Sequence, residues 1–295
     1  VVNDGSTDDS GRIADTWANR FPGIIRVIHQ KNSGVCAARN AGLAQASGDW
    51  ITFPDPDDFL SPDYLDHIRT EILRSQDRPL LAVAAHMVFY YERWNRYGND
   101  HALRYRFGHG IRRVSSTDPE AMYLAHTTST FMRRADIVAH GIHFDSRVRP
   151  SFEDADFVLR LMLAVPDCTI SFLPAPVYFY RKRAAATSQI DAVTGDPDWY
   201  GPHLRTAYLA LMRDTIGLRG HVPRFVQYAV LQSLSAKIRH LMQTCAAAAL
   251  PHQQDAADFY EGVAAVLVHV EDAVIDNGRV PGLDRNLRRV LAWYK

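Results

Sequence analysis

Apolar residues recur with two different periods along the chain, and the change of period divides it into parts. Up to residue 190, short apolar runs alternate with stretches in which apolar residues recur at helical spacing. The runs fall at 24–29, 50–53 and 80–89, and the helical stretches at 10–19, 34–46 and 62–74. This alternation predicts βαβ units, and therefore an α/β fold with a mostly parallel sheet. Ligands of such sheets bind beyond the carboxyl ends of the strands.

Beyond residue 203 the apolar pattern is helical throughout. We predict helices over 222–244, 256–275 and 284–294, the last with Asp284 as its N-cap. The residues before this region include two glycines and two prolines in a short stretch, which is typical of a linker. The predicted parts are an α/β domain over 1–190, a linker over 191–202 and a helical extension over 203–295.

The composition narrows the class of protein. Of the 295 residues, 47% are apolar and 22% charged, which favours a packed core over disorder. The 33 basic and 33 acidic residues cancel, so no basic excess indicates a nucleic-acid partner, and local groups would have to bind any phosphate. Cys36, Cys168 and Cys245 are scattered, which favours a reducing, cytoplasmic compartment over a disulfide framework or a zinc site. No apolar run approaches the roughly 20 residues that span a bilayer.

Two polar motifs lie at the start of predicted helices. Asp4 follows a strand end and precedes Gly5, which permits a tight turn. Its carboxylate can accept hydrogen bonds from a nucleobase or ribose, or it can simply cap the turn. Arg39 lies one to two turns into a helix that follows Asn32 and is rich in Ala and Gly. Its guanidinium could face a nucleotide or pair with a carboxylate.

Three carboxylates follow the predicted strand at 50–53. Asp55, Asp57 and Asp58 lie within four residues, and like charges are unfavourable there unless a cation or strong donors offset them. Hard oxygen ligands of this kind suit Mg²⁺ or Mn²⁺ carrying a diphosphate. The alternative is an acidic turn that caps the next helix.

Two further clusters lie later in the α/β part. Glu153 and Asp154 begin a predicted helix, where the helix dipole favours acidic residues, so they serve either as capping groups or as a general base. A β-like aromatic run ends in three cations, 181–183, and is followed by the hydroxyls of Thr187 and Ser188. This cluster could bind a diphosphate, or it could protect a sheet edge by charge.

The order of these motifs resembles the family-2 glycosyltransferases of the GT-A fold, over about residues 1–190. The matching segments are Asn-Asp-Gly-Ser-Thr-Asp at 3–8, Asn-x-Gly-x-x-x-Ala-Arg-Asn-x-Gly at 32–42, Gly-Asp-Trp-Ile-Thr-Phe-x-Asp-x-Asp-Asp at 48–58, the Glu-Asp pair, and Tyr-Arg with a downstream Ser. The resemblance implies inverting transfer from a nucleotide-sugar, a UDP-sugar in the first place, to a hydroxyl of a cell-surface glycan, polyol-phosphate polymer or lipid-linked acceptor. The alternatives are a GDP- or dTDP-sugar donor, or a non-catalytic nucleotide-sugar-binding or scaffold protein.

The resemblance also implies roles on the donor side. Asp4 matches the carboxylate that reads the base, with Asn32 and Arg39 as neighbouring contacts. Asp55 is similar to the residue at the ribose. Asp57 is similar to the Asp that binds the divalent metal, Mn²⁺ or Mg²⁺.

On the reaction side, Asp154 occupies the place of the general base, with Glu153 as its support or as a contact to the acceptor. Arg181 and Ser188 match positions that hold the diphosphate in bacterial wall teichoic acid glycosyltransferases, which are similar to this chain in having a helical extension. The implied location is the cytoplasm or the cytoplasmic face of the membrane as a peripheral protein, and the helical extension could form a homo-oligomer.

The chain departs from the family in two respects. The usual first strand, apolar–Pro–x–Tyr–Asn, is absent, and the chain opens on Val1 within a strand, so we expect natural sequence upstream. Many members place a metal-binding His after the Tyr-Arg segment, whereas no His occurs here between His143 and His203.

Overall fold

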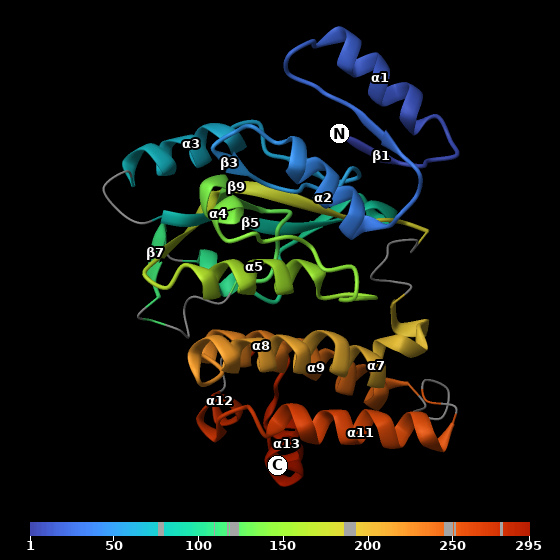
Figure 1. Cartoon of the computed structure of the whole chain (residues 1–295), viewed down its shortest axis with the longest axis vertical. Helices are drawn as coiled ribbons and strands as arrows, with labels where there is room; N and C mark the ends of the chain where they lie inside the picture. Colours follow the sequence, from blue (N-terminus) through green and yellow to red (C-terminus); the bar gives the residue numbers. More distant parts are fainter. Residues whose placement is uncertain are drawn as a thin grey trace.

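A computed structural model of the chain describes residues 1–75, 80–108, 110–116, 118, 124–185, 193–244, 250, 252–277 and 280–295. An α/β part and a helical part are stacked on each other, with helix α5 (Glu153–Ala164) between the sheet and the helices that follow (Figure 1). The chain starts in the α/β part and ends at the far side of the helical part. Among the described residues, no helix combines the length and the apolar character that crossing a membrane requires.

Two long parallel strands, β5 (Leu80–Tyr91) and β9 (Thr169–Lys182), form the centre of the main sheet. Its strands follow the order β3-β8-β5-β9-β4, with β6 paired to β5 and β7 to β9. A separate parallel pair joins β1 (Val2–Asp4) to β2 (Ile28–Gln30). The short outer strands are β3 (Trp50–Ile51), β4 (Phe59–Leu60), β6 (Arg96–Gly98), β7 (Arg112–Ser115) and β8 (Thr130–Arg133).

The prediction of a mostly parallel sheet is wrong in this detail, although the α/β class is confirmed. Among the described strands only β1–β2 and β5–β9 run parallel, and the other pairs are antiparallel. The alternating pattern gives one β1–α1–β2 unit at the start. Apart from β5 and β9, the later strands are two to four residues long and pair in the antiparallel sense, β3 with β8 and the others with β5 or β9, which needs no helical crossover.

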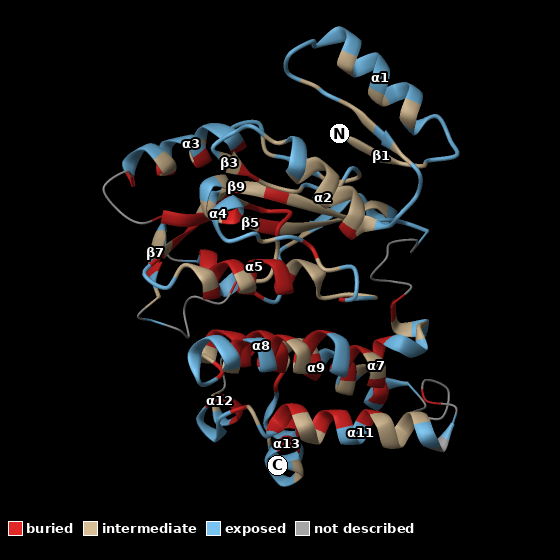
Figure 2. Ribbon diagram, viewed as in Figure 1, coloured by how far each residue is buried: buried red, intermediate tan, exposed pale blue. Residues whose placement is uncertain are grey.

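The predicted helices of the α/β part are confirmed. They are α1 (Ser10–Arg20), α2 (Val35–Gln45) and α3 (Tyr64–Arg74). Helix α5 is apolar on nearly all sides, with eight of its twelve residues buried, as expected for a helix covered by the sheet and by other helices (Figure 2). Its first turn is acidic, and this end faces the cavity described below. The remaining short elements are η1 (Glu92–Trp94), η2 (Arg104–Phe107) and α4 (Arg134–Ala139).

The helical part contains the predicted helices with one correction. The predicted helix over 256–275 is two helices, because tight backbone hydrogen bonds turn the chain at His269 and Val270 and a new helix starts after Glu271. The Asp284 cap is confirmed, since its carboxylate accepts from the backbone N–H groups of Asn286 and Leu287. The helices are α7 (Gly201–His203), the π-helical η5 (Leu204–Leu209), α8 (Ala210–Arg219), α9 (Arg224–Gln243), α11 (Gln253–Leu267), α12 (Asp272–Asp276) and α13 (Arg285–Tyr294).

One hydrophobic core joins the two parts. Buried residues in it extend from Cys36 of α2 to Leu291 of α13 and include Trp199 and Tyr200, which fall in the predicted linker. In the described part of that segment the chain forms two 3₁₀ turns, η3 (Val193–Gly195) and η4 (Pro197–Trp199). The division into domains stays a prediction.

Candidate active site

A cavity of about 1690 Å³ opens between the α/β part and the helical part. The α/β part contributes the start of α2, the turn after β3, the ends of β5 and β9, and the start of α5. The helical part contributes one face of α9 and the segment 280–284. The cavity therefore combines the strand-end location expected for a ligand with a wall that lies outside the α/β part.

Arg39 holds three carboxylates together at one side of this cavity. Its Nη1 donates to Asp154 Oδ1 at 2.5 Å and to Glu153 Oε1 at 3.2 Å, and its Nη2 donates to Asp55 Oδ1 at 3.2 Å. Only 12% of the Arg39 side chain is exposed. Burial opposes the charge on Arg39, but Asp154, Glu153 and Asp55 together raise its pKa above the ordinary value. One guanidinium thus joins α2, the turn after β3 and the start of α5.

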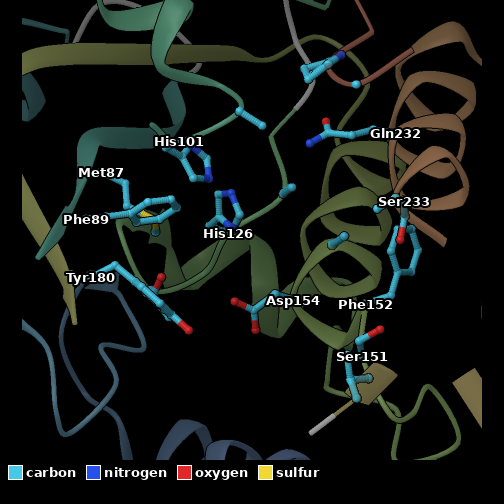
Figure 3. Close-up of a pocket in the computed structure, with 18 of the residues that line it drawn as sticks. Met87, Phe89, His101, His126, Ser151, Phe152, Asp154, Tyr180, Gln232 and Ser233 are labelled. Atoms are coloured by element: carbon cyan, nitrogen blue, oxygen red, sulfur yellow. The ribbon is translucent and has the colours of Figure 1, made fainter. Parts of the chain in front are cut away.

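Asp154 is fixed at both of its carboxylate oxygens. Oδ1 accepts from Arg39, and Oδ2 accepts from the backbone N–H of Thr127 at 3.2 Å. The side chain lies in the middle of the cavity, between the α/β wall and the helical wall (Figure 3). Its position in the first turn of α5 also places it at the positive end of the helix dipole.

Burial changes the acidity of the neighbouring carboxyl groups. It raises the pKa of Glu153 to about 7, assisted by the charge of Asp154 and opposed by Arg39. It also raises the pKa of Asp55, against the attraction of Arg39. Carboxyl groups whose pKa is raised by burial beside a charged partner are common at functional sites.

The three carboxylates of the turn after β3 have separate partners. Asp55 pairs with Arg39, and Asp57 Oδ2 accepts from Arg183 Nε at 2.6 Å. Asp58 points into the protein, where it accepts from the hydroxyl of Tyr178 at 2.7 Å and from the backbone N–H of Arg181 at 2.8 Å. Burial raises the pKa of Asp58 to about 6. Of the three, Asp55 and Asp57 line the cavity.

Asp4 and Asn32 lie outside this cavity. The Asp4 carboxylate accepts from the backbone N–H groups of Ser33 and Gly34, at 2.9 and 2.8 Å, and from the Gln30 amide at 2.7 Å. Gly5 has φ +73°, and a Cβ there would lie 2.6 Å from the backbone nitrogen of Asn32. The carboxylate therefore fixes the turn around residues 32–34, which is the turn-capping alternative, and its role toward a base stays a prediction.

The predicted diphosphate residues are not brought together in the cavity. The guanidinium of Arg181 pairs with Glu92 and is not among the cavity-lining groups, whereas Lys182 and Arg183 are. Ser188, like Thr187, lies outside the described residues. The role of Arg181 and Ser188 toward a diphosphate stays a prediction.

Several cavity residues carry no signal in the sequence. His101 and His126 line the wall beside Asp154, with their ring centroids 4.7 Å apart (Figure 3). Burial lowers the pKa of both, that of His101 to about 2, so their rings are neutral. They come from irregular segments with no period or motif that would single them out. Gln232 and Ser233 lie on the face of α9 that lines the cavity; the sequence predicts a helix there but not that this face borders a site.

A divalent cation could be held here by one protein carboxylate. Among the described residues, no three His, Cys, Asp or Glu side chains are grouped as metal ligands. Asp57 lines the cavity, its side chain is 24% exposed, and one of its oxygens is engaged by Arg183. Mg²⁺ is commonly bound by one or two carboxylates together with substrate phosphates, so this donor set fits a cation that arrives with a diphosphate.

A carboxylate turn after the edge strand β3 and an acidic helix start that faces the same cavity are the features that the resemblance to glycosyltransferases of the GT-A fold implies. Residues 1–138, slightly less than half of the chain, match the Glycosyl transferase family 2 profile, and this part of the chain is a domain of that family. The crystal structure of Staphylococcus aureus TarS residues 1–349 in complex with UDP-GlcNAc has a similar fold, with a TM-score of 0.63. The two share 19% identity, over all of this chain and 81% of that one.

Two proteins of Bacillus subtilis (strain 168) are similar in sequence. The minor teichoic acid biosynthesis protein GgaB is 27% identical over 93% of this chain, and GgaA is 27% identical over 78% of it. The matched regions make up 29% of the length of GgaB and 50% of the length of GgaA. The chain thus spans half or less of these relatives. The predicted family and fold are confirmed.

Proposed function

We propose that the chain transfers a sugar from a nucleotide-sugar, a UDP-sugar in the first place, to a hydroxyl of a cell-surface polymer, with inversion at the anomeric carbon. The observation that carries the proposal is the single cavity in which Asp57 and Asp154 lie together with a wall from the helical part. The binding of UDP-GlcNAc by the similarly folded TarS and the teichoic acid role in the names of GgaA and GgaB support the donor and the acceptor.

The proposed step is one displacement. Asp154 takes the proton of the acceptor hydroxyl, whose oxygen forms a bond to the anomeric carbon while the bond from that carbon to the diphosphate oxygen breaks. Arg39 and the Thr127 N–H orient the carboxylate for this task. Lys182 and Arg183 lie on the cavity wall, where cations stabilise the charge that develops on the leaving diphosphate.

Asp57 would hold a divalent cation, Mn²⁺ or Mg²⁺, together with the diphosphate. Such an ion supplies Lewis-acid stabilisation of the leaving group. The residues of the chain position that group: Asp57 from the turn after β3 and Arg183 from the segment after β9 are 2.6 Å apart. An ion at Asp57 and the guanidinium of Arg183 would therefore act on the same part of the donor.

A phosphate-bearing polymer would fit the acceptor side of the cavity. Arg104, Arg112 and Arg239 line it, and none of the three pairs with a carboxylate of a described residue. Arginine is well suited to bind phosphate because of its planar set of donors. In this proposal residues 1–190 bind the donor, residues 203–295 complete the acceptor wall, and 191–202 connect the two.

Calorimetry with matched nucleotide-sugars tests the donor. We expect a UDP-sugar to bind in the presence of Mn²⁺ more tightly than the GDP- or dTDP-sugar, followed by release of UDP when a polyol-phosphate acceptor is added. Equal or tighter binding of the GDP-sugar would contradict the UDP proposal. Donor binding without any transfer or hydrolysis would favour the alternative of a non-catalytic nucleotide-sugar-binding protein.

Asp57→Asn should abolish the effect of Mn²⁺ on donor binding and leave the fold intact, because the side chain is partly exposed and keeps its shape. Calorimetry with and without Mn²⁺, and a melting curve, measure the two properties. Asp58→Asn is the matched control from the same turn, since Asp58 faces Tyr178 rather than the cavity. Wild-type transfer that is insensitive to EDTA would show that the metal role is wrong.

A further inference from the structure

We propose that His203 and Phe152 are positioning residues through which the helical part holds the Glu153–Asp154 turn in its reactive geometry. This inference rests on the proposed function, because it assigns a role toward the base of that reaction. Neither residue touches the reacting atoms. Both act on the backbone that carries Asp154.

The backbone immediately before α5 has an unfavourable conformation. Phe152 has φ +80° and ψ −2°, in the left-handed region that favours glycine. Among the described residues, Asn95 is the only other non-glycine with positive φ, and Asn tolerates this region far better than an aromatic residue. Such a conformation persists only where the surrounding structure holds it.

The helical part stabilises this backbone conformation through His203. The Nε2 of His203 lies 2.7 Å from the carbonyl oxygen of Ser151, the residue just before Phe152. Since a carbonyl can only accept, Nε2 carries the proton and donates it. Burial, and next the nearby Lys237, lower the pKa of His203 to about 3, so the ring is neutral. The other nitrogen, Nδ1, is buried with no hydrogen-bond partner among the described residues, which leaves Ser151 as the polar contact of this ring.

The aromatic ring of Phe152 is held by the same helices. It packs edge-to-face on Tyr208, with centroids 4.9 Å apart, and more distantly on His203 at 6.4 Å. Tyr208 is itself fixed by a hydrogen bond of 2.5 Å between its hydroxyl and Ser233 of α9. Figure 3 shows Ser151 and Phe152 beside the helical wall and Asp154 in the middle of the cavity.

A movement of this anchored segment would move the base. The carbonyl of Phe152 accepts from the backbone N–H of Asp156 at 2.8 Å and so forms the first turn of α5, which carries Asp154. On its other side Asp154 is held by Arg39. The carboxylate is therefore placed from two directions, by α2 through Arg39 and by the helical part through residues 151–152.

The test uses substitutions of His203 that distinguish the contribution of its hydrogen bond to Ser151 from that of its aromatic ring. His203→Phe keeps an aromatic ring and removes the hydrogen bond, whereas His203→Gln can still donate from its amide. We expect kcat to fall by about 10–100-fold in His203→Phe, because a displacement of about 1 Å can cost 10²-fold, and to recover in His203→Gln. The Kd for the UDP-sugar should be unchanged in both. Thr215→Val is the matched control, because it also removes a buried side-chain hydrogen bond of the helical part, one of 2.7 Å to the carbonyl of Leu211 rather than to residue 151.

A second readout does not depend on activity. Amide hydrogen exchange of residues 151–156 should be faster in His203→Phe than in the wild type, and unchanged in Thr215→Val. If the wild type transfers no sugar, the proposed function fails while exchange still tests the positioning role. If His203→Phe lowers the melting temperature but leaves kcat and the exchange of this segment unchanged, the role is merely structural and the inference is overturned.

Phe152→Gly provides the alternative should His203→Phe fail to fold. Glycine adopts φ +80° without strain, so the backbone is relieved while the aromatic anchor is lost. We expect a folded protein with faster exchange at residues 153–156 and a lower kcat. Wild-type kcat in Phe152→Gly would overturn the inference.

Discussion

Arg39→Met should lower the free energy of unfolding by about 3–5 kcal/mol, the range for removing one partner of a buried charge cluster. Met keeps much of the aliphatic volume but leaves Asp55, Glu153 and Asp154 without their shared cation. Urea denaturation at pH 8 measures the loss. Arg12→Met is the control, because Arg12 pairs with Asp9 on the surface, where both side chains are about 70% exposed, and should cost well under 1 kcal/mol.

The loss in Arg39→Met should depend on pH in a defined direction. The pKa of Glu153 is raised from 4.5 to about 7, so the folded state keeps its proton to higher pH than the unfolded state. The contribution of this group to stability is complete below pH 4.5 and is lost as the pH rises toward 7 and beyond. Without Arg39 the carboxyl group of Glu153 ionises less readily still. The difference in the free energy of unfolding between Arg39→Met and the wild type should therefore be small near pH 4 and widen up to pH 8.

A second substitution separates charge repulsion from lost packing. Glu153→Gln in the Arg39→Met background removes one ionised group at nearly constant volume and should restore part of the stability at pH 8. If the double variant is no more stable than Arg39→Met, and the loss is the same at pH 4 and pH 8, packing rather than charge explains the effect.

The sequence predicts best the elements that carry a long apolar period. Helices α1, α2, α3, α9 and α13 appear within about two residues of their predicted ends, because 10–20 residues of one period leave little ambiguity. Strands β4, β6, β7 and β8 have two to four residues each and carry no such pattern. They exist because β5 and β9 offer unpaired edges, which is a property of the assembled sheet.

The sequence predicted which residues belong to the site, but not which of them contact one another. The order of motifs placed Arg39, Asp55 and Asp154 in one family pattern. They are far apart in the sequence, and only the folded chain, which brings α2, the turn after β3 and the start of α5 together, shows that one guanidinium binds both carboxylates. Phe152 could not be predicted at a left-handed position, because local preference there favours glycine or asparagine. The helical part overrides this preference through contacts made by residues some 50 positions later.

Asp154→Asn should reduce sugar transfer by roughly 10²–10⁴-fold, the usual effect of losing a positioned general base. The amide has nearly the same shape but cannot take the proton of the acceptor hydroxyl. The affinity for the UDP-sugar should change little, since the base acts on the acceptor. Steady-state kinetics give the first quantity and calorimetry the second.

The same turn of α5 contains a matched control for this substitution. Asp156 is 1% exposed, pairs with Arg160 at 2.8 Å and does not line the cavity, so Asp156→Asn should leave turnover close to that of the wild type when the protein is folded. Asn can accept from Arg39 with its oxygen, but its amide then meets the Thr127 N–H, so a small loss of stability is expected in Asp154→Asn. That loss lowers the melting temperature without lowering turnover per folded molecule. Near-wild-type turnover in Asp154→Asn would show that Asp154 caps the helix, and Glu153, whose pKa of about 7 suits a base, would take its place.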